Sequence, residues 1–104
     1  MDPVMYDELS PLKRRLVREQ YRHEQGGLCW YCKASLNELP PAEILVKPVN
    51  ENLFPDGFFN WPVHLHHDKE TGLTIGAVHC YCNAVSFQYE ELPARKAKDL
   101  ESQM

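Results

Sequence analysis

The sequence predicts one small α+β domain. Three observations support this: apolar residues at helical spacing after position 11, alternating apolar and polar residues between positions 63 and 78, and a set of four cysteines and five histidines. The chain has 104 residues, 43% of them hydrophobic, which suffices for a single core. Because so small a domain buries a limited share of its surface, we expect a metal ion or a partner to add stability.

The apolar segments are short. The longest uninterrupted one covers residues 28–32, which is too short for a membrane-spanning helix or for the apolar part of a signal peptide. We therefore expect a cytoplasmic protein with no membrane partner. In a reducing compartment, closely paired cysteines bind zinc more often than they form disulfides.

The first predicted element is an amphipathic helix over residues 11–25. Ser10 and Pro11 are a helix-start signal, and Gly26 with Gly27 supplies the stop. One face is expected to pack on the domain while the basic residues point outward. The apolar residues of this helix are Leu12, Leu16, Val17 and Tyr21, and the basic ones are Lys13, Arg14, Arg15, Arg18 and Arg22.

The charge of the chain is unevenly distributed. A net charge of −4 alone disfavours a nucleic-acid partner, but residues 10–25 carry a net charge of +3. A basic helix on an acidic body is compatible with binding a polyanion through one face. A solvated helix face is the alternative explanation.

Residues 33–62 lack a clear period, and only residues 44–46 resemble a short strand. So long an irregular stretch is unusual in a compact domain, so we expect it to pack as a structured excursion. Its large apolar side chains are expected to form local core rather than a base-stacking surface. They are Leu53, Phe54, Phe58, Phe59 and Trp61.

A β-hairpin is predicted over residues 63–78, because residues 63–66 and 73–77 alternate and residues 69–72 read as a turn. A helix is expected to follow from Cys80 and to end at Pro93. Residues 93–104 then form either a frayed helix or a disordered tail.

Two pairs of metal-ligating residues flank this hairpin. Tetrahedral zinc needs converging ligands, and a two-residue gap lets one turn present two of them. Cys29 and Cys32 have that gap, and so do His79 and Cys82, whereas Cys80 is left as a spare thiol. We therefore predict a structural Cys3His zinc site that joins the two ends of the domain. A redox pair or plain buried thiols are the alternatives.

Between the two pairs, residues 64–72 read HLHHDKETG, and Asn83 follows the last predicted ligand. With the paired zinc ligands and Gly76, this order resembles the HNH nucleases of the ββα-metal fold, in particular the subgroup similar to recombination endonuclease VII that is common in phages. The resemblance covers residues 63–85 with Cys29 and Cys32. It leaves out the first helix, the excursion and the tail.

The resemblance implies roles for individual residues. By the family pattern, His66 and Asn83 would bind a catalytic divalent metal, and His67 would be the general base that activates water. His64 and Asp68 match neighbouring polar positions and would support the site or face the substrate. The implied fold is a zinc-stabilised ββα-metal core over residues 63–92 with an added N-terminal helix.

The chain departs from the subgroup at several positions. The subgroup has Asp where this chain has His66, His at Lys69, and Cys at His79; some members also have an acidic residue at the position of Ser86. Histidine at the first of these positions occurs in other HNH nucleases. Loss of the carboxylate is expected to shift the catalytic metal from Mg²⁺ toward Mn²⁺, Ni²⁺ or Zn²⁺. Because this chain has Ser86 in place of that acidic residue, we expect junction resolution less than general nicking.

The leading expectation is therefore a single-domain, metal-dependent endonuclease that nicks or cleaves double-stranded DNA, as a monomer or homodimer, in the host cytoplasm if phage-encoded. The basic residues of the helix at 11–25 would contact backbone phosphates without reading sequence. One alternative is a non-catalytic zinc-stabilised module that binds DNA or protein. The other is a structure-selective nuclease that resolves DNA junctions.

Overall fold

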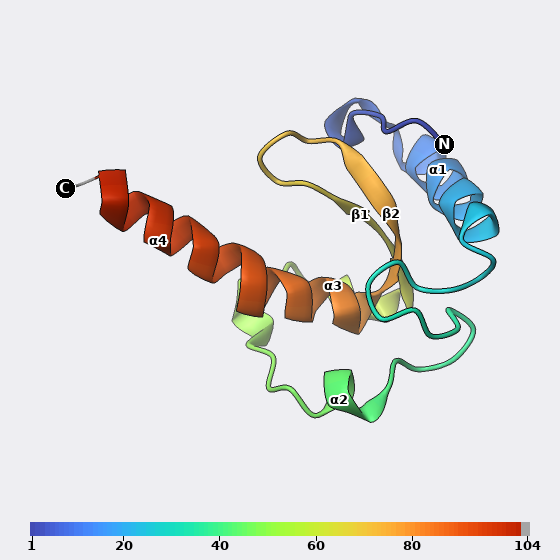
Figure 1. Ribbon diagram of the computed structural model, residues 1–104. Coiled ribbons are helices and arrows are strands. Elements are labelled where there is room, and N and C mark those ends of the chain that lie inside the picture. The colour runs from blue at the N-terminus through green and yellow to red at the C-terminus, as the bar shows by residue number, and fades with distance from the viewer. Residues whose placement is uncertain (103–104) are drawn as a thin grey trace.

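The computed structural model describes residues 1–102, which form a two-stranded antiparallel sheet with helices around it (Figure 1). In Figure 1, α1 lies alongside the hairpin, α3 passes beneath its open end, and α4 projects away from the body. The elements are α1 (Pro11–Glu24), α2 (Ala42–Leu45), β1 (Val63–His67), β2 (Thr74–His79), α3 (Cys80–Ser86) and α4 (Leu92–Ser102), with 3-10 turns at Tyr6–Glu8, Glu51–Leu53 and Phe58–Asn60 and a π-helical segment at Phe87–Glu91.

Helix α1 confirms the predicted helix and its start signal. The Ser10 hydroxyl accepts the Lys13 amide at 3.2 Å, Pro11 occupies the first turn, and the left-handed Gly26 and Gly27 follow the last residues. The end of the helix at Glu24 is one residue earlier than predicted.

The face that α1 turns toward the sheet differs from the prediction. Leu12 and Leu16 are 65% and 60% exposed, whereas Tyr21 is buried. The Tyr21 hydroxyl shares a 2.8 Å hydrogen bond with the Thr74 hydroxyl on β2, which fixes the rotation of the helix. The inward face therefore runs from Arg14 through Val17 to Tyr21. A polar contact with the sheet, rather than the leucine pair, decides the orientation.

The predicted hairpin is confirmed as β1 and β2. Val63 pairs with His79 and His66 with Gly76, and the register shifts between His66 and His67. At the turn, Asp68 Oδ1 accepts the amides of Glu70 and Thr71, and Gly72 has φ +78°. These hydrogen bonds lower the pKa of Asp68.

Both α1 and α3 pack against the hairpin, and the core lies between them. It includes two of the cysteines together with apolar residues from α1, the loop that follows it and both strands. The core members are Tyr21, Cys29, Leu36, Val63, Leu65, Ala77, Val78 and Cys82.

The outer edge of β2 is closed by a side chain. Gln25 Oε1 accepts the Ala77 amide at 2.8 Å, and Gln25 Nε2 donates to the Ala77 carbonyl at 2.9 Å. The Trp30 amide donates to the same carbonyl at 2.9 Å. The amide of Gln25 thus takes the place of a third strand at this point.

Gly76 leaves no room for a side chain beside this edge. A Cβ at this position would lie 2.7 Å from Gln25 Oε1 and 3.1 Å from the Trp30 side chain. We expect Gly76→Ala to destabilise the protein by about 1–3 kcal/mol in urea unfolding, as overpacking typically does. In a double-mutant cycle with Gln25→Ala, the cost should be less than additive because that variant removes the clash. Additive costs would contradict this explanation.

The excursion at residues 33–62 contains helix α2 where a short strand is predicted at residues 44–46. The prediction of that strand is therefore wrong. The amide of Ile44 donates to the Pro41 carbonyl at 2.9 Å, and that of Val46 donates to the Ala42 carbonyl at 2.9 Å. Proline at the start sets a helical turn, and the sheet in residues 1–102 has only β1 and β2, so no strand is available for pairing.

The phenylalanines of the excursion pack against one another and are partly buried, but they do not join the buried core. The ring of Phe54 lies 4.7 Å from that of Phe58 and 5.8 Å from that of Phe87, and the rings of Phe58 and Phe59 are 5.0 Å apart. Leu53 and Trp61, which belong to the same predicted set, are 39% and 66% exposed.

The prediction that the last helix ends at Pro93 is also wrong. Pro93 is the second residue of α4, and the helix continues to Ser102. A π-helical segment lies directly before α4, and in it the Leu92 amide donates to the Phe87 carbonyl. This wider turn avoids the steric clash that a proline ring makes with the preceding turn of a regular α-helix. Residues 93–102 of the predicted tail are therefore helical, and residues 103–104 lie outside the described part.

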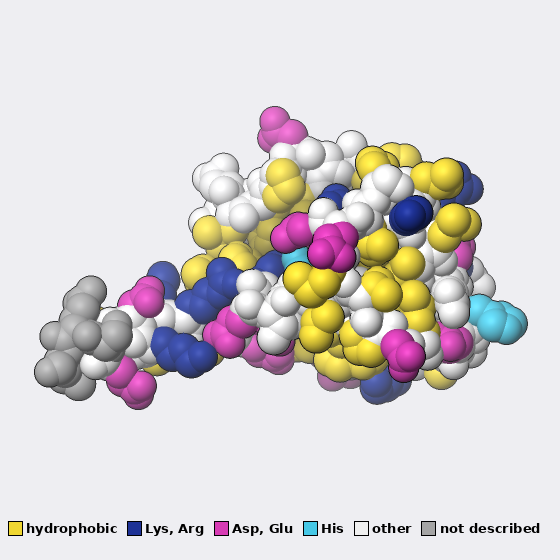
Figure 2. Space-filling model, turned by 90° about the horizontal axis from the view of Figure 1, so that it is seen from above, with side chains coloured by type: hydrophobic (Ala, Val, Ile, Leu, Met, Phe, Trp, Pro, Cys, Tyr) yellow, Lys and Arg dark blue, Asp and Glu magenta, His cyan; other side chains and the backbone are white. Residues whose placement is uncertain are grey.

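Helix α4 extends from the body as a rod that carries both positive and negative side chains (Figure 2). Lys98 at its outer part forms a 3.0 Å ion pair with Glu70 at the hairpin turn. Among residues 1–102, the helices are too short or too polar to cross a lipid bilayer.

Candidate metal centre and candidate active site

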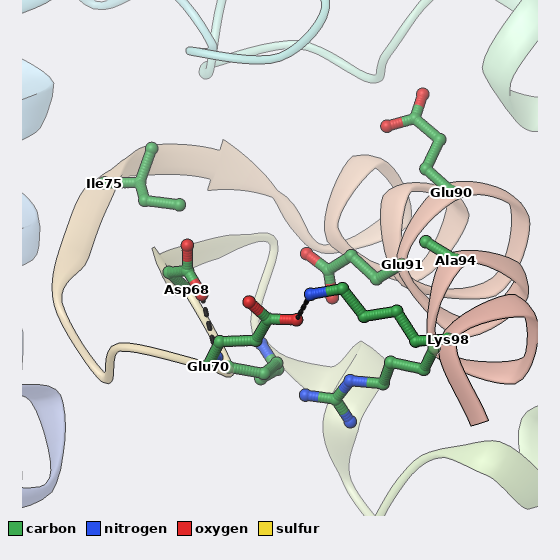
Figure 3. Close-up of a pocket in the computed structure, with 9 residues that line it drawn as sticks. Asp68, Glu70, Ile75, Glu90, Glu91, Ala94 and Lys98 are labelled. Atoms are coloured by element: carbon green, nitrogen blue, oxygen red, sulfur yellow. Dashed lines mark hydrogen bonds and ion pairs between the residues drawn. The ribbon is translucent and has the colours of Figure 1, made fainter. Parts of the chain in front are cut away.

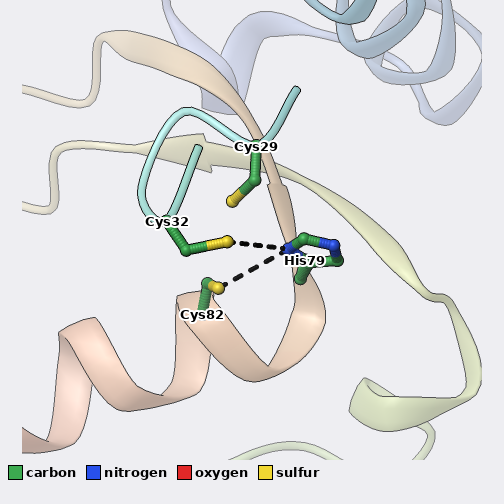
Figure 4. Close-up of side chains that lie close together, drawn as sticks. All are labelled: Cys29, Cys32, His79 and Cys82. Atoms are coloured by element: carbon green, nitrogen blue, oxygen red, sulfur yellow. Dashed lines mark hydrogen bonds between the residues drawn. The ribbon is translucent and has the colours of Figure 1, made fainter. Parts of the chain in front are cut away.

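Four ligand atoms meet where the predicted zinc site lies. The donor atoms of Cys29, Cys32, His79 and Cys82 all lie within 4.8 Å of one another (Figure 4). His79 Nδ1 is 3.4 Å from Cys32 Sγ and 3.6 Å from Cys82 Sγ. The edge of a tetrahedral zinc site between sulfur and nitrogen ligands is about 3.6 Å. The cluster could therefore hold one metal ion, and the buried Cys80 lies outside it.

The loop that carries the first two ligands is held against β2. Lys33 adopts φ +67°, its amide donates to the Cys29 carbonyl at 3.0 Å, and the Cys29 amide donates to Ala34 at 2.8 Å. These bonds close a tight knuckle that turns both thiols to one side. The other two ligands come from the end of β2 and the first turn of α3.

The hydrogen bonds of His79 select its metal-binding nitrogen. Nε2 lies 2.8 Å from the Ser35 carbonyl and 2.9 Å from the Glu38 carbonyl. Because a carbonyl only accepts, Nε2 carries the proton, and the Nδ1 lone pair faces the thiols. An imidazole oriented in this way by backbone carbonyls is typical of zinc sites.

The thiols of the cluster oppose each other's ionisation. The thiol of Cys82 lowers the pKa of Cys29 to about 4, and the resulting Cys29 thiolate raises the pKa of Cys82. One negative charge therefore makes the next one costly. A divalent cation would remove this conflict, so the donor set fits zinc chemically.

Three polar side chains of the predicted active site form one hydrogen-bonded chain. His64 Nε2 donates to the Phe58 carbonyl at 2.8 Å, which leaves its Nδ1 to accept from Asn83 Nδ2 at 3.1 Å. Asn83 Oδ1 then faces His66 Nδ1 at 3.0 Å. Burial lowers the pKa of both histidines. The structure thus brings His66 and Asn83 together, and His64 orients the asparagine.

His67, which follows the bulge in β1, points to a different environment. Its ring stacks on Tyr6 with 3.9 Å between centroids and 10° between planes. Burial lowers the pKa of His67 to about 4, so the imidazole is neutral at pH 7 and able to accept a proton. Its Nδ1 is buried, and no group in residues 1–102 pairs with it. Stacking, rather than a carbonyl, orients this ring.

Tyr6 is held in place from two sides. The Thr74 amide donates to the Val4 carbonyl at 2.9 Å and the Tyr6 amide donates to the Gly72 carbonyl at 2.9 Å, so the N-terminal segment lies along β2. The guanidinium of Arg14 lies 4.1 Å from the centre of the Tyr6 ring. Arg14 and Tyr6 together link α1 to His67.

His64, His67 and Asn83 open onto one groove of about 910 Å³. Three of the five basic residues predicted to contact DNA line the same groove, and they are Arg14, Arg15 and Arg18. Lys13 and Arg22 do not line it. His66 is 4% exposed and reaches the groove only through Asn83. Asp68 lies outside the groove and accepts hydrogen bonds from backbone amides of the hairpin turn.

Sequence reasoning missed two residues of this region. Tyr6 covers His67, and Glu91 Oε1 lies 3.8 Å from His66 Nε2. Both are distant in sequence from the histidines, and neither belongs to a short motif. The sequence around Tyr6 and around Glu91 has no helical or strand period that would have indicated a functional role.

Comparisons with protein-family models, with curated proteins and with solved structures found no match for this chain.

Proposed function

We propose that this protein is a metal-dependent endonuclease of the HNH type that hydrolyses phosphodiester bonds in double-stranded DNA. The observation that carries the proposal is the shared groove, where an unprotonated histidine, an amide ligand and three arginines meet. A scissile phosphate would be held there by cations beside a group able to accept a proton.

His67 is the general base in this proposal. Its position in the groove would let it take a proton from water. The lowered pKa keeps the ring neutral at pH 7 but also makes it a weaker base than an ordinary histidine. Tyr6 stabilises the ring orientation from one face. Proton transfer of this kind contributes about 10²–10⁴ to the rate.

His66 Nδ1 and Asn83 Oδ1 would hold the catalytic divalent metal. The two atoms are 3.0 Å apart, and adjacent ligands of one octahedral ion at bond lengths near 2.1 Å are separated by about 3 Å. When bound, the ion would stabilise the negative charge that develops on the phosphate and on the departing oxygen. An imidazole ligand favours Mn²⁺, Ni²⁺ or Zn²⁺ over Mg²⁺.

The second metal of this proposal is a structural zinc at Cys29, Cys32, His79 and Cys82. It would join the knuckle after α1 to the start of α3, and so place Asn83, the next residue after Cys82, at the groove. The metal centre and the active site are therefore adjacent in the chain as well as in space.

The arginines at the groove should bind DNA through its backbone. Each phosphate contact contributes about −0.9 to the slope of log K against log salt. We expect Arg15→Ala to weaken DNA binding and to flatten that slope by about this amount, measured by fluorescence anisotropy at several salt concentrations. Arg22→Ala is the matched control, because Arg22 lies on the same helix but contacts Asn37 and Glu19. Equal effects of both variants would refute the groove as the binding surface.

A non-catalytic zinc-stabilised module is the second candidate. The observation in its favour is that His64, Asn83 and His66 satisfy one another and that His66 is buried, as in a structural polar network. In that case the groove would bind DNA or a protein without cleaving it.

A plasmid-nicking assay separates the two candidates. We expect the zinc-loaded protein to convert supercoiled plasmid to open circles with added Mn²⁺, more slowly with Mg²⁺, and not with a chelator of the added ion. Absence of cleavage with Mn²⁺, Ni²⁺, Zn²⁺ and Mg²⁺, together with retained DNA binding, would favour the module. Four-way junctions tested beside linear duplex report whether cleavage is structure-selective.

A further inference from the structure

The imidazole of His66 lies between an amide oxygen and a carboxylate. On one side its Nδ1 faces Asn83 Oδ1 at 3.0 Å, and on the other its Nε2 faces Glu91 Oε1 at 3.8 Å. A neutral imidazole carries one N–H and so serves only one of these acceptors. A proton on Nδ1 makes the hydrogen bond to Asn83 and leaves Nε2 without a proton beside the carboxylate.

The orientation of the Asn83 amide is not free to resolve this conflict. The Phe58 carbonyl requires the proton of His64 on Nε2, so His64 Nδ1 accepts from the amide nitrogen of Asn83. The amide oxygen must then face His66. A flip of Asn83 would let its amide nitrogen donate to His66 Nδ1, but it would set the amide oxygen against the lone pair of His64 Nδ1 and so lose the hydrogen bond to His64.

A cation at the edge shared by His66 Nδ1 and Asn83 Oδ1 satisfies every group. Both atoms then direct lone pairs to the ion, and the single imidazole proton is on Nε2, which faces the Glu91 carboxylate at 3.8 Å. Glu91 Oε2 is also buried, with no hydrogen-bond partner in residues 1–102.

The helix geometry places Glu91 on the same side as Asn83. Residues seven apart share a face of a regular α-helix, but Glu91 is eight residues after Asn83. The π-helical segment Phe87–Glu91 absorbs one extra residue, so Glu91 returns to the face that carries Asn83. Insertions of this type frequently occur at functional sites.

Figure 3 shows Glu91 reaching from the helix toward the hairpin, near the Glu70–Lys98 ion pair, whereas the Glu90 side chain, which also lines this pocket, extends in another direction. The pocket has a volume of about 320 Å³. Glu90 instead accepts a hydrogen bond from the Tyr31 hydroxyl at 2.6 Å. Two adjacent carboxylates thus have different surroundings, and this pair provides a matched control.

We propose that Glu91 is a positioning residue that holds the imidazole proton of His66 on Nε2 and so presents Nδ1 to the metal ion shared with Asn83. This inference rests on the proposed function, because it needs that ion. The carboxylate also supplies a negative charge to a site whose two direct ligands are neutral. Outer carboxylates of this kind typically change metal affinity 10–100-fold.

Direct Mn²⁺ binding tests the proposal without reference to catalysis. Free Mn²⁺ is measured by electron paramagnetic resonance during titration of the zinc-loaded protein. We expect Glu91→Gln to weaken Mn²⁺ binding 10–100-fold, Glu91→Asp to weaken it less than Glu91→Gln, and Glu90→Gln to leave it within about threefold of wild type. Zinc content and circular dichroism confirm that each variant is folded.

The possible outcomes separate this inference from the proposed function. If the wild type binds no Mn²⁺ beyond its zinc, the catalytic metal site is refuted and this role of Glu91 with it. If the wild type binds Mn²⁺ but Glu91→Gln binds it equally well, or if Glu90→Gln is equally weakened, only the role of Glu91 is overturned.

A measurement on the wild type covers the case in which Glu91→Gln does not fold. Long-range ¹H–¹⁵N correlations of His66 in Mg²⁺-saturated protein report which ring nitrogen carries the proton. The proposal requires protonated Nε2 and an Nδ1 without a proton. Protonated Nδ1 in the metal-saturated protein would overturn it.

Discussion

Chelation of the metal from the Cys29–Cys32–His79–Cys82 centre is expected to unfold the protein. Cys29 and Cys82 are core residues, and the centre joins the knuckle after α1 to the start of α3. Structural zinc contributes about 10–16 kcal/mol in small zinc-binding peptides, which matches or exceeds the total stability of about 5–15 kcal/mol for a typical domain. Loss of the helical circular dichroism signal with loss of one zinc per chain is the expected result.

Single cysteine variants supply the control for this prediction. Cys82→Ser should abolish the cooperative thermal transition, because three ligands and a misplaced hydroxyl remain in the core. Cys80→Ser should still fold and bind one zinc, because Cys80 is buried outside the cluster. A chelated protein that melts at the same temperature as the zinc-loaded protein would show that the cluster is a set of ordinary buried thiols.

His67→Ala is expected to reduce plasmid cleavage by about 10²–10⁴, which is the usual contribution of a general base. The groove is lined by His64 and His67, and of these two only His67 is not hydrogen-bonded to Asn83. Zinc content and DNA affinity should stay close to wild type, because His67 is outside the metal cluster and the arginines are unchanged.

His23→Ala is the matched control, because His23 is an exposed histidine in the last turn of α1. Its cleavage rate should equal that of wild type. Cleavage by His67→Ala within about threefold of wild type, with a contaminating nuclease ruled out by an inactive Asn83→Ala preparation, would exclude His67 as the base.

Several elements follow from local sequence and were predictable. The Ser10–Pro11 signal starts α1, the alternating residues form β1 and β2, and the two-residue gaps select four ligands out of nine cysteines and histidines. Each of these features depends on neighbours within a few positions. Local spacing was therefore enough to predict them.

Other elements depend on contacts between distant residues. The rotation of α1 is decided by the bond from Tyr21 to Thr74, 53 positions away. The helix continues through Pro93 because a π-helical segment precedes it, and sequence patterns do not show such a segment. Residues 44–46 are apolar enough for a strand but have no strand beside them within residues 1–102.

By itself the sequence determined the four residues of the candidate metal centre, the hairpin and the histidines that it carries. Only the tertiary structure decided which of those histidines face the groove, and it brought Tyr6 to His67 and Glu91 to His66. The physical reason is that ligand spacing and strand alternation act over a few residues of backbone. Ring stacking and the approach of a carboxylate to a histidine instead depend on side chains that meet only after the chain has folded.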